Sequence, residues 1–290
     1  MDYRKEYEKW LASPALSEDE RAELKALEGN DKEIKARFYG PLEFGTAGLR
    51  GTMYTGLHNM NRHVIRWATQ GFANVIRAEG TEAMKKGVAV CMDCRNHSAE
   101  FARETACVMA ANGIHVRLFE SLRPTPELSF AVREYGCQAG VNVTASHNPK
   151  EYNGYKVYWA DGAQLPPQHA AAIADELTRI DIFTGVQSMD YEQALAEGRI
   201  ELLGEDCDRR FMANVMGMVN DYETVKKVAD DFGLVYTPFH GCGYKLVPEA
   251  LTRLGIKHLH CVPEQMVIDG DFPTVVSPNP ENPEGFYLAI

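Results

Sequence analysis

The sequence predicts an α/β protein of consecutive domains, each with a mostly parallel mixed sheet sandwiched between helices. Three observations indicate this fold class. The 290 residues exceed the usual length of one domain, so two domains are expected. A content of 45% hydrophobic and 24% charged residues is that of an ordinary globular protein. Apolar strand-like runs alternate with helical patterns of roughly ten to fifteen residues, which favours strands joined by crossover helices.

Residues 1–40 are expected to form a helical leader. Ser17 and Glu20 fit a capping box, in which a serine and a following glutamate bond each other's backbone N–H groups. Apolar residues then recur at roughly helical spacing: Leu24, Leu27, Ile34 and Phe38. The helical pattern ends near Gly40 and Pro41, because both residue types interrupt helices.

Residues 41–205 are expected to form the first α/β domain. Strands are predicted at 49–53, 88–92, 114–119, 139–144 and 156–159, and helices at 61–76, 98–112 and 126–135. Ser98 can cap the second of these helices and Gly113 can end it, since these residue types favour those positions. Ligands bind such sheets at the ends of the strands, so the loops there are candidate sites.

Residues 206–290 are expected to form a second α/β domain, because the acidic and polar stretch 181–205 loses the periodic pattern. Helices are predicted at 206–219 and 244–254, the latter closed by Gly255, and strands at 232–236 and 257–262. Asn282 and Pro283 are helix-start signals that stand only about two turns before the last residue. We therefore expect this domain to be incomplete, through truncation or as a naturally short product.

Charge and hydropathy narrow the partners and the compartment. A net charge of −11 argues against nucleic acid or an anionic membrane as a general partner, because both require a cationic surface. The N-terminus is charged and lacks the apolar core of a signal peptide, and no apolar run approaches the roughly 18 residues of a membrane span. We expect a cytoplasmic protein with neither partner. A local basic pocket for a phosphosugar stays compatible with this charge.

The cysteines do not suggest a disulfide framework. Seven of them are scattered along the chain, an odd number that favours a reducing compartment. Cys91 and Cys94 form C-M-D-C, which fits a redox pair or half of a zinc site. No second C-x-x-C follows, and Cys91 lies in an apolar run, so a structural role for both is the favoured interpretation.

The loop at 144–149, T-A-S-H-N-P, is the main candidate for chemistry. It follows a predicted strand, and its small and loop-forming residues allow the hydroxyl of Ser146 to project into a cleft. On loop chemistry alone, a polar loop in which Ser146 merely caps a neighbouring element is the favoured interpretation.

The longer string makes a chemical role for Ser146 the favoured interpretation. T-A-S-H-N-P followed by N-G-Y-K resembles the phosphoserine loop of the α-D-phosphohexomutase superfamily, the phosphoglucomutases and phosphomannomutases. F-G-T-A-G-L-R-G at 44–51 is similar to the family's substrate loop. Further similar segments follow in family order: 59–62, 93–95 with Ser98, 124–126 and 277–281. The strings at 44–51 and 146–159 are typical of the phosphoglucomutase and phosphopentomutase branch.

The resemblance implies a mechanism in which a phosphorylated Ser146 gives its phosphoryl group to a sugar monophosphate. The resulting bisphosphate turns over and returns its other phosphate, so that sugar 1- and 6-phosphates, or pentose 1- and 5-phosphates, interconvert. His147 and Lys156 are implied as catalytic residues, and Lys156 suits proton transfer because a partly buried lysine titrates readily.

Substrate binding is implied for Arg50, Thr46 and Asn148. Arginine suits forked contacts with phosphate, and cations must surround a phosphoserine that carries about −1.5 to −2 charge. Asn148 is expected to support the loop through side-chain hydrogen bonds to backbone. Asp93, Arg95 and Ser98 are expected to form a supporting scaffold without a catalytic role.

The resemblance also implies Mg²⁺ as cofactor and glucose 1,6-bisphosphate as activator. Family members bind the metal with a D-x-D-x-D-R loop, whose carboxylates join an oxygen of the phosphoserine. That string does not occur in this sequence, so the phosphate on Ser146 is the one metal ligand that the resemblance implies within it. The nearest match is Asp269-Gly-Asp271, followed by Phe272 and Pro273. We expect the metal loop to belong beyond residue 290 and the chain alone to be inactive.

Two other functions are compatible with parts of the sequence. One is a hydrolase that uses Ser146 with His147, although adjacent residues rarely aim at each other and the nucleophile elbow G-x-S-x-G is absent around Ser146. The other is a non-catalytic module that binds sugar phosphates and has kept the loops without the metal site.

Overall fold

A six-stranded sheet organises the larger domain in the computed structural model, which describes residues 2–290. Its strands lie in the order β1-β5-β4-β2-β3-β6. Their bounds are β1 Leu49–Thr52, β2 Val88–Met92, β3 Val116–Phe119, β4 Ala139–Val143, β5 Tyr152–Trp159 and β6 Ile200–Leu203. β4, β2, β3 and β6 pair in parallel, whereas β5 runs antiparallel to both β4 and β1. The predicted α/β class with a mostly parallel mixed sheet is confirmed.

The central strands are apolar because helices cover both faces of the sheet. Every residue of β2 and β4 is buried, and the two strands pair in the register Val90 with Val141. Strands buried on both faces form continuous apolar runs instead of alternating with polar residues. Crossover connections between parallel strands are right-handed. The chain moves one way along the sheet from β2 to β3 and back the other way from β3 to β4, so the two connecting helices lie on opposite faces.

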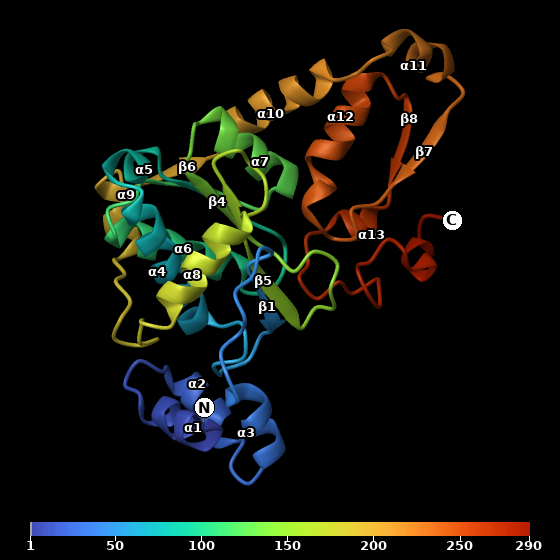
Figure 1. Ribbon diagram of the computed structural model, residues 1–290. Coiled ribbons are helices and arrows are strands. Elements are labelled where there is room, and N and C mark those ends of the chain that lie inside the picture. Colours follow the sequence, from blue (N-terminus) through green and yellow to red (C-terminus); the bar gives the residue numbers. More distant parts are fainter. Residues whose placement is uncertain (1) are drawn as a thin grey trace.

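Helices form the two outer layers (Figure 1). α4 (Arg62–Ala78), α6 (Ser98–Ala111) and α8 (Pro167–Leu177) pack together on one side. α7 (Thr125–Glu134) packs on β2 and β4 and is backed by α10 (Glu205–Gly217). Two short helices, α5 (Thr81–Lys86) and α9 (Tyr191–Ala196), lie in the connections. The largest fully buried side chains of this core include Phe72, Phe119 and Tyr155.

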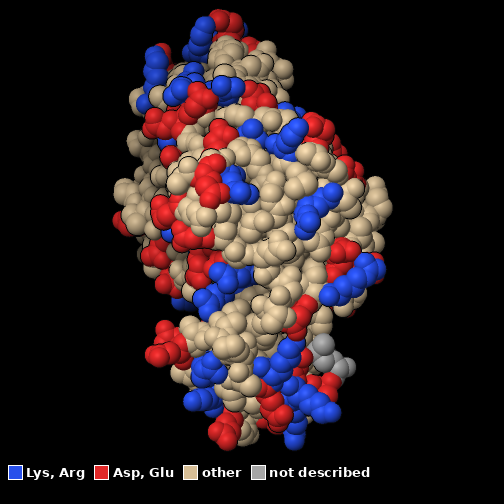
Figure 2. All heavy atoms as spheres, turned by 90° about the vertical axis from the view of Figure 1, so that its left-hand side faces the viewer, with Lys and Arg blue, Asp and Glu red and all other residues tan. Residues whose placement is uncertain are grey.

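The leader forms three helices, α1 (Tyr3–Ala12), α2 (Glu18–Lys25) and α3 (Asp31–Phe38), which make the blue lobe of Figure 1. Trp10 is fully buried and meets Phe38 edge-on, with 5.7 Å between ring centroids. The predicted capping box of Ser17 and Glu20 is confirmed. In Figure 2 acidic and basic side chains are interspersed on this lobe, at the bottom of the view.

The second domain is a smaller layer around two parallel strands, β7 (Gly233–Tyr236) and β8 (His258–Cys261). It also holds α11 (Tyr222–Val228), α12 (Leu246–Leu254) and α13 (Pro263–Met266), with 3₁₀ turns η1 (Cys242–Tyr244) and η2 (Pro283–Phe286). Gly255 ends α12 in the left-handed conformation, as predicted. Many exposed large apolar side chains belong to this domain, among them Met218, Val235, Val276 and Tyr287.

The structure corrects several element predictions. Ser98 is the first residue of α6 and not its cap, because its hydroxyl donates to Asp93 instead, and His97 precedes it in the left-handed region. The helix expected from Pro283 is a 3₁₀ turn without a side-chain cap from Asn282. α5, α8, α9, α11, α13 and β6 were not expected. β6 extends the sheet by pairing with β3. The domain boundary at residue 205 stays a prediction.

Within residues 2–290, no helix is both long enough and apolar enough to cross a membrane.

Glu20 joins the leader to the larger domain and makes stability depend on pH. Its carboxylate accepts from the backbone N–H of Ser17 at 2.7 Å and lies 3.0 Å from Arg62 and 3.1 Å from His63 on α4. Burial opposes ionisation, but the bonds from His63 and Ser17 outweigh it and lower the pKa of Glu20 to about 2. A lowered pKa stabilises the fold above the unfolded pKa, and that stability is lost as the pH falls toward 2.

We predict that Glu20→Gln, which keeps the capping box, lowers the free energy of unfolding at pH 7 by about 1–2 kcal/mol, a range reduced for solvent screening. Denaturant unfolding from pH 7 to pH 2 measures this difference, which should vanish toward pH 2. Glu18→Gln, at an exposed acid in the same first turn, is the matched control. A loss that is equal in both variants, or that persists at pH 2, would contradict this account.

Candidate active site at the carboxyl ends of β2 and β4

Ser146 is presented by a strained loop directly after β4. The residue is exposed and its backbone has a φ of +60°. Residues with a Cβ rarely adopt this left-handed region, which costs roughly 1–2 kcal/mol. The backbone N–H of Ser146 donates to the hydroxyl of Thr144 at 2.9 Å, which helps to hold this conformation. The loop therefore directs the Ser146 side chain away from the sheet, into solvent.

Arg95, in the loop after β2, holds the Ser146 loop in place. Its guanidinium donates to four backbone carbonyls: Ser146 at 2.9 Å, Asn148 at 2.6 Å, Pro149 at 2.9 Å and Tyr152 at 3.0 Å. The side chain is fully buried. Since β2 and β4 are parallel neighbours, their loops emerge at the same edge of the sheet, and one arginine reaches across both.

Asp93 in turn holds Arg95. Its carboxylate accepts from the backbone N–H of Arg95 at 2.9 Å and from the Ser98 hydroxyl at 2.7 Å, and lies 3.3 Å from Nε of Arg95. The amide of Asn153 on β5 donates to the Ser98 hydroxyl at 3.0 Å. Burial is the largest influence on Asp93 and raises its pKa, against bonds from Thr144, Arg95 and Ser98. These contacts form the expected scaffold beneath the loop.

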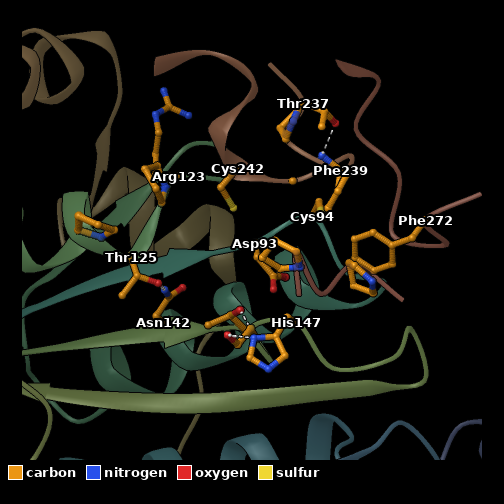
Figure 3. Close-up of a pocket in the computed structure, with 18 of the residues that line it drawn as sticks. Asp93, Cys94, Arg123, Thr125, Asn142, His147, Thr237, Phe239, Cys242 and Phe272 are labelled. Carbon is orange, nitrogen blue, oxygen red and sulfur yellow. Dashed lines mark hydrogen bonds between the residues drawn. The ribbon is translucent and has the colours of Figure 1, made fainter. Parts of the chain in front are cut away.

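A cleft of about 480 Å³ opens in front of this loop, between the two domains (Figure 3). The larger domain contributes Ser146 and His147, the β2 loop and the first residues of α7. The second domain contributes Thr237, Phe239, Cys242, Phe272 and Phe286 to the lining. Thr125 begins α7 and accepts from the amide of Asn142 at 2.8 Å. A helix N-terminus at this place favours an anionic ligand.

Backbone strain gathers around the cleft. Five non-glycine residues in the described part of the chain have positive φ: His97, Ser146, Phe239, His240 and Phe272. Ser146, Phe239 and Phe272 line the cleft itself. Such conformations persist only where surrounding contacts determine them, and they concentrate at functional sites. Both domains thus store strain at the surfaces that face each other here.

Lys156 and Arg50 lie on the same side of the sheet, beside the loop. Arg50 on β1 pairs with Gly154 on β5, so the Lys156 side chain is its diagonal neighbour. Burial lowers the pKa of Lys156, the nearby Arg50 and Arg95 charges lower it further, and Asp93 opposes them. A lowered pKa increases the share of unprotonated lysine at a given pH, which favours a role as a base.

Thr46 lies in a turn that rests on β5. Gly48 closes this turn with a φ of +76°, and a Cβ there would come within 1.8 Å of the Tyr155 carbonyl oxygen. Only glycine fits so close to the strand. Thr46 is exposed in the turn, two residues before Gly48, whose Cβ position lies 3.2 Å from Cα of Lys156. The F-G-T-A-G-L-R-G string thus brings an exposed hydroxyl and an arginine to the edge of the sheet.

The structure separates the predicted site residues into two groups. Ser146 and His147 line the cleft, whereas Arg50, Thr46, Asn148 and Lys156 lie outside its lining. Asn148 accepts a hydrogen bond from Arg95 through its backbone carbonyl, whereas hydrogen bonds from its side chain were expected. The distance from Oγ of Ser146 to Nδ1 of His147 is 3.4 Å, too long for a strong hydrogen bond and poor support for the hydrolase alternative.

Sequence reasoning missed the contribution of the second domain. Phe239, Cys242 and Phe286 carry no local signal of a site, because aromatic and small residues are common in any core. In the sequence, Phe272 was noted only as one of the residues at which the chain differs from the metal motif. A sequence signal for it did exist in the Asp269-Gly-Asp271 turn that precedes it, since such residues favour tight turns that can present a side chain.

The described residues do not fit a magnesium site by themselves. Residues 2–290 contain no group of three or more His, Cys, Asp or Glu side chains placed to share a metal ion. The same holds for zinc at C-M-D-C: Cys91 is buried and Cys94 half-buried, and both are free thiols. Burial raises the pKa of Cys94 to about 12, which leaves little reactive thiolate.

Fold and site together define an α/β protein that presents an exposed serine from a loop held by buried charges. Family models for phosphoglucomutase/phosphomannomutase match the chain at residues 41–182, as alpha/beta/alpha domain I, and 209–290, as alpha/beta/alpha domain II. The chain belongs to the phosphoglucomutase/phosphomannomutase family, as the motifs predicted.

Similar curated proteins agree with this assignment. A phosphoglucomutase of Staphylococcus saprophyticus is 33% identical, over 89% of this chain and 45% of that protein. A phosphoribomutase of Saccharomyces cerevisiae is 35% identical, over 96% of this chain and 46% of that protein. A solved structure of a putative phosphomannomutase from Thermus thermophilus shares the fold with a TM-score of 0.69, 23% identity, and coverage of 86% of this chain and 51% of that one. The chain thus spans about half the length of these relatives.

We predict that Arg50→Gln raises the pKa of Lys156, because it removes a positive neighbour that disfavours the ammonium form. An NMR titration of the Lys156 side-chain Cε signal, assigned with Lys156→Arg, measures the shift. Arg117→Gln, at an arginine on β3 that pairs with Glu201, is the control and should leave the titration unchanged. An unchanged Lys156 titration in Arg50→Gln would show that the two charges do not share a site.

Proposed function

We propose that this chain carries the phosphoryl-accepting part of a sugar-phosphate mutase, with Ser146 as the residue that is phosphorylated. The observation that supports this most is the exposed Ser146, held at the cleft by a loop with four carbonyls bonded to one buried arginine. Phosphoryl transfer requires accurate in-line placement of the attacking oxygen, and a rigid loop supplies it. The names of the curated relatives agree with this reaction class.

The proposed step is reversible and conserves the phosphoryl group. The bond between phosphorus and Oγ of Ser146 breaks as a hydroxyl oxygen of the sugar monophosphate bonds to phosphorus. The hydroxyl proton passes to a base, for which we propose the unprotonated form of Lys156, since a lowered pKa increases the share of that form. Oγ of Ser146 leaves with the electron pair of the broken bond and takes up a proton from solvent. In the return step the other phosphate of the bisphosphate moves to Ser146. Sugar 1- and 6-phosphates, or pentose 1- and 5-phosphates, interconvert in this way.

Charges around the loop suit a phosphate. Arg50 and Lys156 stand beside it, and the N-terminus of α7 faces the cleft. A phosphoserine adds about −1.5 to −2 charge, which these groups offset. We propose that Arg50, Thr46 and Asn148 contact the substrate, and that His147 holds the phosphate or passes a proton. Arg123 also lines the cleft, but Asp208 neutralises it at 2.6 Å.

Mg²⁺ and glucose 1,6-bisphosphate are the proposed cofactor and activator, on the basis of the family resemblance. In that proposal the Ser146 phosphate supplies a metal ligand. The described residues bring no group of three His, Cys, Asp or Glu side chains together that could supply the remaining ligands. A cytoplasmic location and the absence of nucleic-acid and membrane partners stay predictions from charge and sequence.

Complete turnover is proposed for a protein of the relatives' length, since the chain spans about half of them. We propose that this chain by itself does not complete the cycle. The alternative is a module that binds sugar phosphates without transferring the phosphoryl group. The lack of a three-ligand metal group in residues 2–290 favours that alternative, and the strained, exposed serine favours transfer.

We predict that the chain, incubated with Mg²⁺ and glucose 1,6-bisphosphate, gains one phosphate on Ser146. Intact mass measures the gain, and peptide fragmentation maps it. Ser146→Ala should gain none, whereas Ser129→Ala, at a serine that bonds the Gly162 carbonyl away from the cleft, should behave as wild type.

Phosphate elsewhere, or equal phosphate in Ser146→Ala, would overturn the assignment of Ser146. Binding of the bisphosphate by calorimetry without any phosphate on the wild-type chain would favour the binding module. The calorimetric test uses the same wild-type chain and the same Ser146→Ala control.

A further inference from the structure

The turn at residues 269–272 in the second domain lies against the loop that holds Ser146. Gly270 is in such close contact that a Cβ there would come within 2.6 Å of the Asn96 backbone nitrogen and 2.9 Å of the Cys94 carbonyl oxygen. Asp271 accepts from the Asn96 amide at 3.3 Å and lies 3.3 Å from the ammonium of Lys150. The second domain therefore touches both the β2 loop and the Ser146 loop.

Phe272 makes the contact that matters most, because its partner is Arg95. The guanidinium carbon of Arg95 lies 5.3 Å from the centre of the Phe272 ring. An arginine donates hydrogen bonds from the edges of its plane and stacks with its face. Arg95 uses its two terminal nitrogens on the four carbonyls of the Ser146 loop, and the Phe272 ring is a further neighbour of the same guanidinium.

The backbone at Phe272 is strained to place the ring there. Its φ is +50°, a region that bulky residues avoid, and the side chain is only 5% exposed. The turn is held by two bonds to Asp269: its carboxylate accepts from the N–H of Asp271 at 2.8 Å and its carbonyl from the N–H of Phe272 at 3.3 Å. A conformation of this cost persists where its contacts require it.

We propose that Phe272 is a positioning residue for Ser146: its ring covers Arg95 and thereby couples the docking of the second domain to the order of the phosphoryl-accepting loop. This inference rests on the proposed function of Ser146 for its catalytic meaning. The coupling itself is a property of the fold and has its own readout. The exposed pair of Asp271 and Lys150 adds little, because exposed ion pairs are weak.

The test measures amide hydrogen exchange in residues 146–152 and, in the same samples, the rate at which Ser146 gains phosphate. Phe272→Leu keeps an apolar side chain and loses the ring. We expect the loop amides to exchange between about threefold and thirtyfold faster, the range that loss of a cation–π contact predicts, and phosphate gain to slow by a similar factor. Phe272→Tyr keeps the ring and should restore both values.

Phe286→Leu is the matched control, because Phe286 lines the same cleft from the same domain but packs on Phe239 instead of Arg95. Its loop amides should exchange as in wild type. Phe272→Met, with another flexible apolar side chain, carries the same test if Phe272→Leu does not fold.

Loop exchange at the wild-type rate in Phe272→Leu would overturn the proposal, and so would an equal acceleration in Phe286→Leu. The two hypotheses fail separately. If wild type gains no phosphate while Phe272→Leu still loosens the loop, the coupling holds and the proposed function of Ser146 is wrong. If phosphate gain is normal in Phe272→Leu and the loop stays ordered, the coupling is wrong and Ser146 keeps its assignment.

Discussion

The hydrogen bonds between the buried Arg95 guanidinium and the carbonyls of residues 146–152 are the interaction on which the site depends. Carbonyls in a tight loop have few partners of their own, and a loop without them would be mobile. A lysine has fewer donors and no planar fork, so an arginine is the side chain that fits. Burying its charge requires a counter-charge, which Asp93 supplies. The position of Ser146 thus follows from one buried ion pair.

The sheet topology explains why this ion pair can form. β2 and β4 are adjacent parallel strands whose loops leave the sheet at the same edge, so Asp93 and Arg95 stand next to the loop that carries Ser146. The antiparallel β5 then returns Lys156 past Asn142, and β1 adds Arg50 at the sheet edge. The cationic residues of the site come from strands that are neighbours in space and distant in sequence.

Local signals predicted much of the fold and the loop that carries Ser146. Val88–Met92 is a continuous apolar run, Ala139–Val143 is apolar except for Asn142, and the capping box at Ser17 is a short-range motif, so all three could be predicted from the sequence. The 200–203 strand and the 167–177 helix lie in stretches whose patterns are too short or too polar to distinguish. The role of Ser98 was mistaken because Asp93, its partner, becomes a neighbour only when the loop folds. The aromatic side of the cleft depends on how two domains meet, which no local pattern encodes.

Limited trypsin proteolysis of Arg95→Lys tests most directly whether Arg95 sets the order of the Ser146 loop. Lys150 is an exposed cleavage site within that loop, and Lys226 in α11 is an exposed site far along the chain that reports general unfolding. We expect cleavage after Lys150 to accelerate by at least about tenfold in the variant, since several hydrogen bonds to charge are lost, while cleavage after Lys226 keeps its wild-type rate. Equal rates at Lys150 in the variant and the wild type would contradict this expectation.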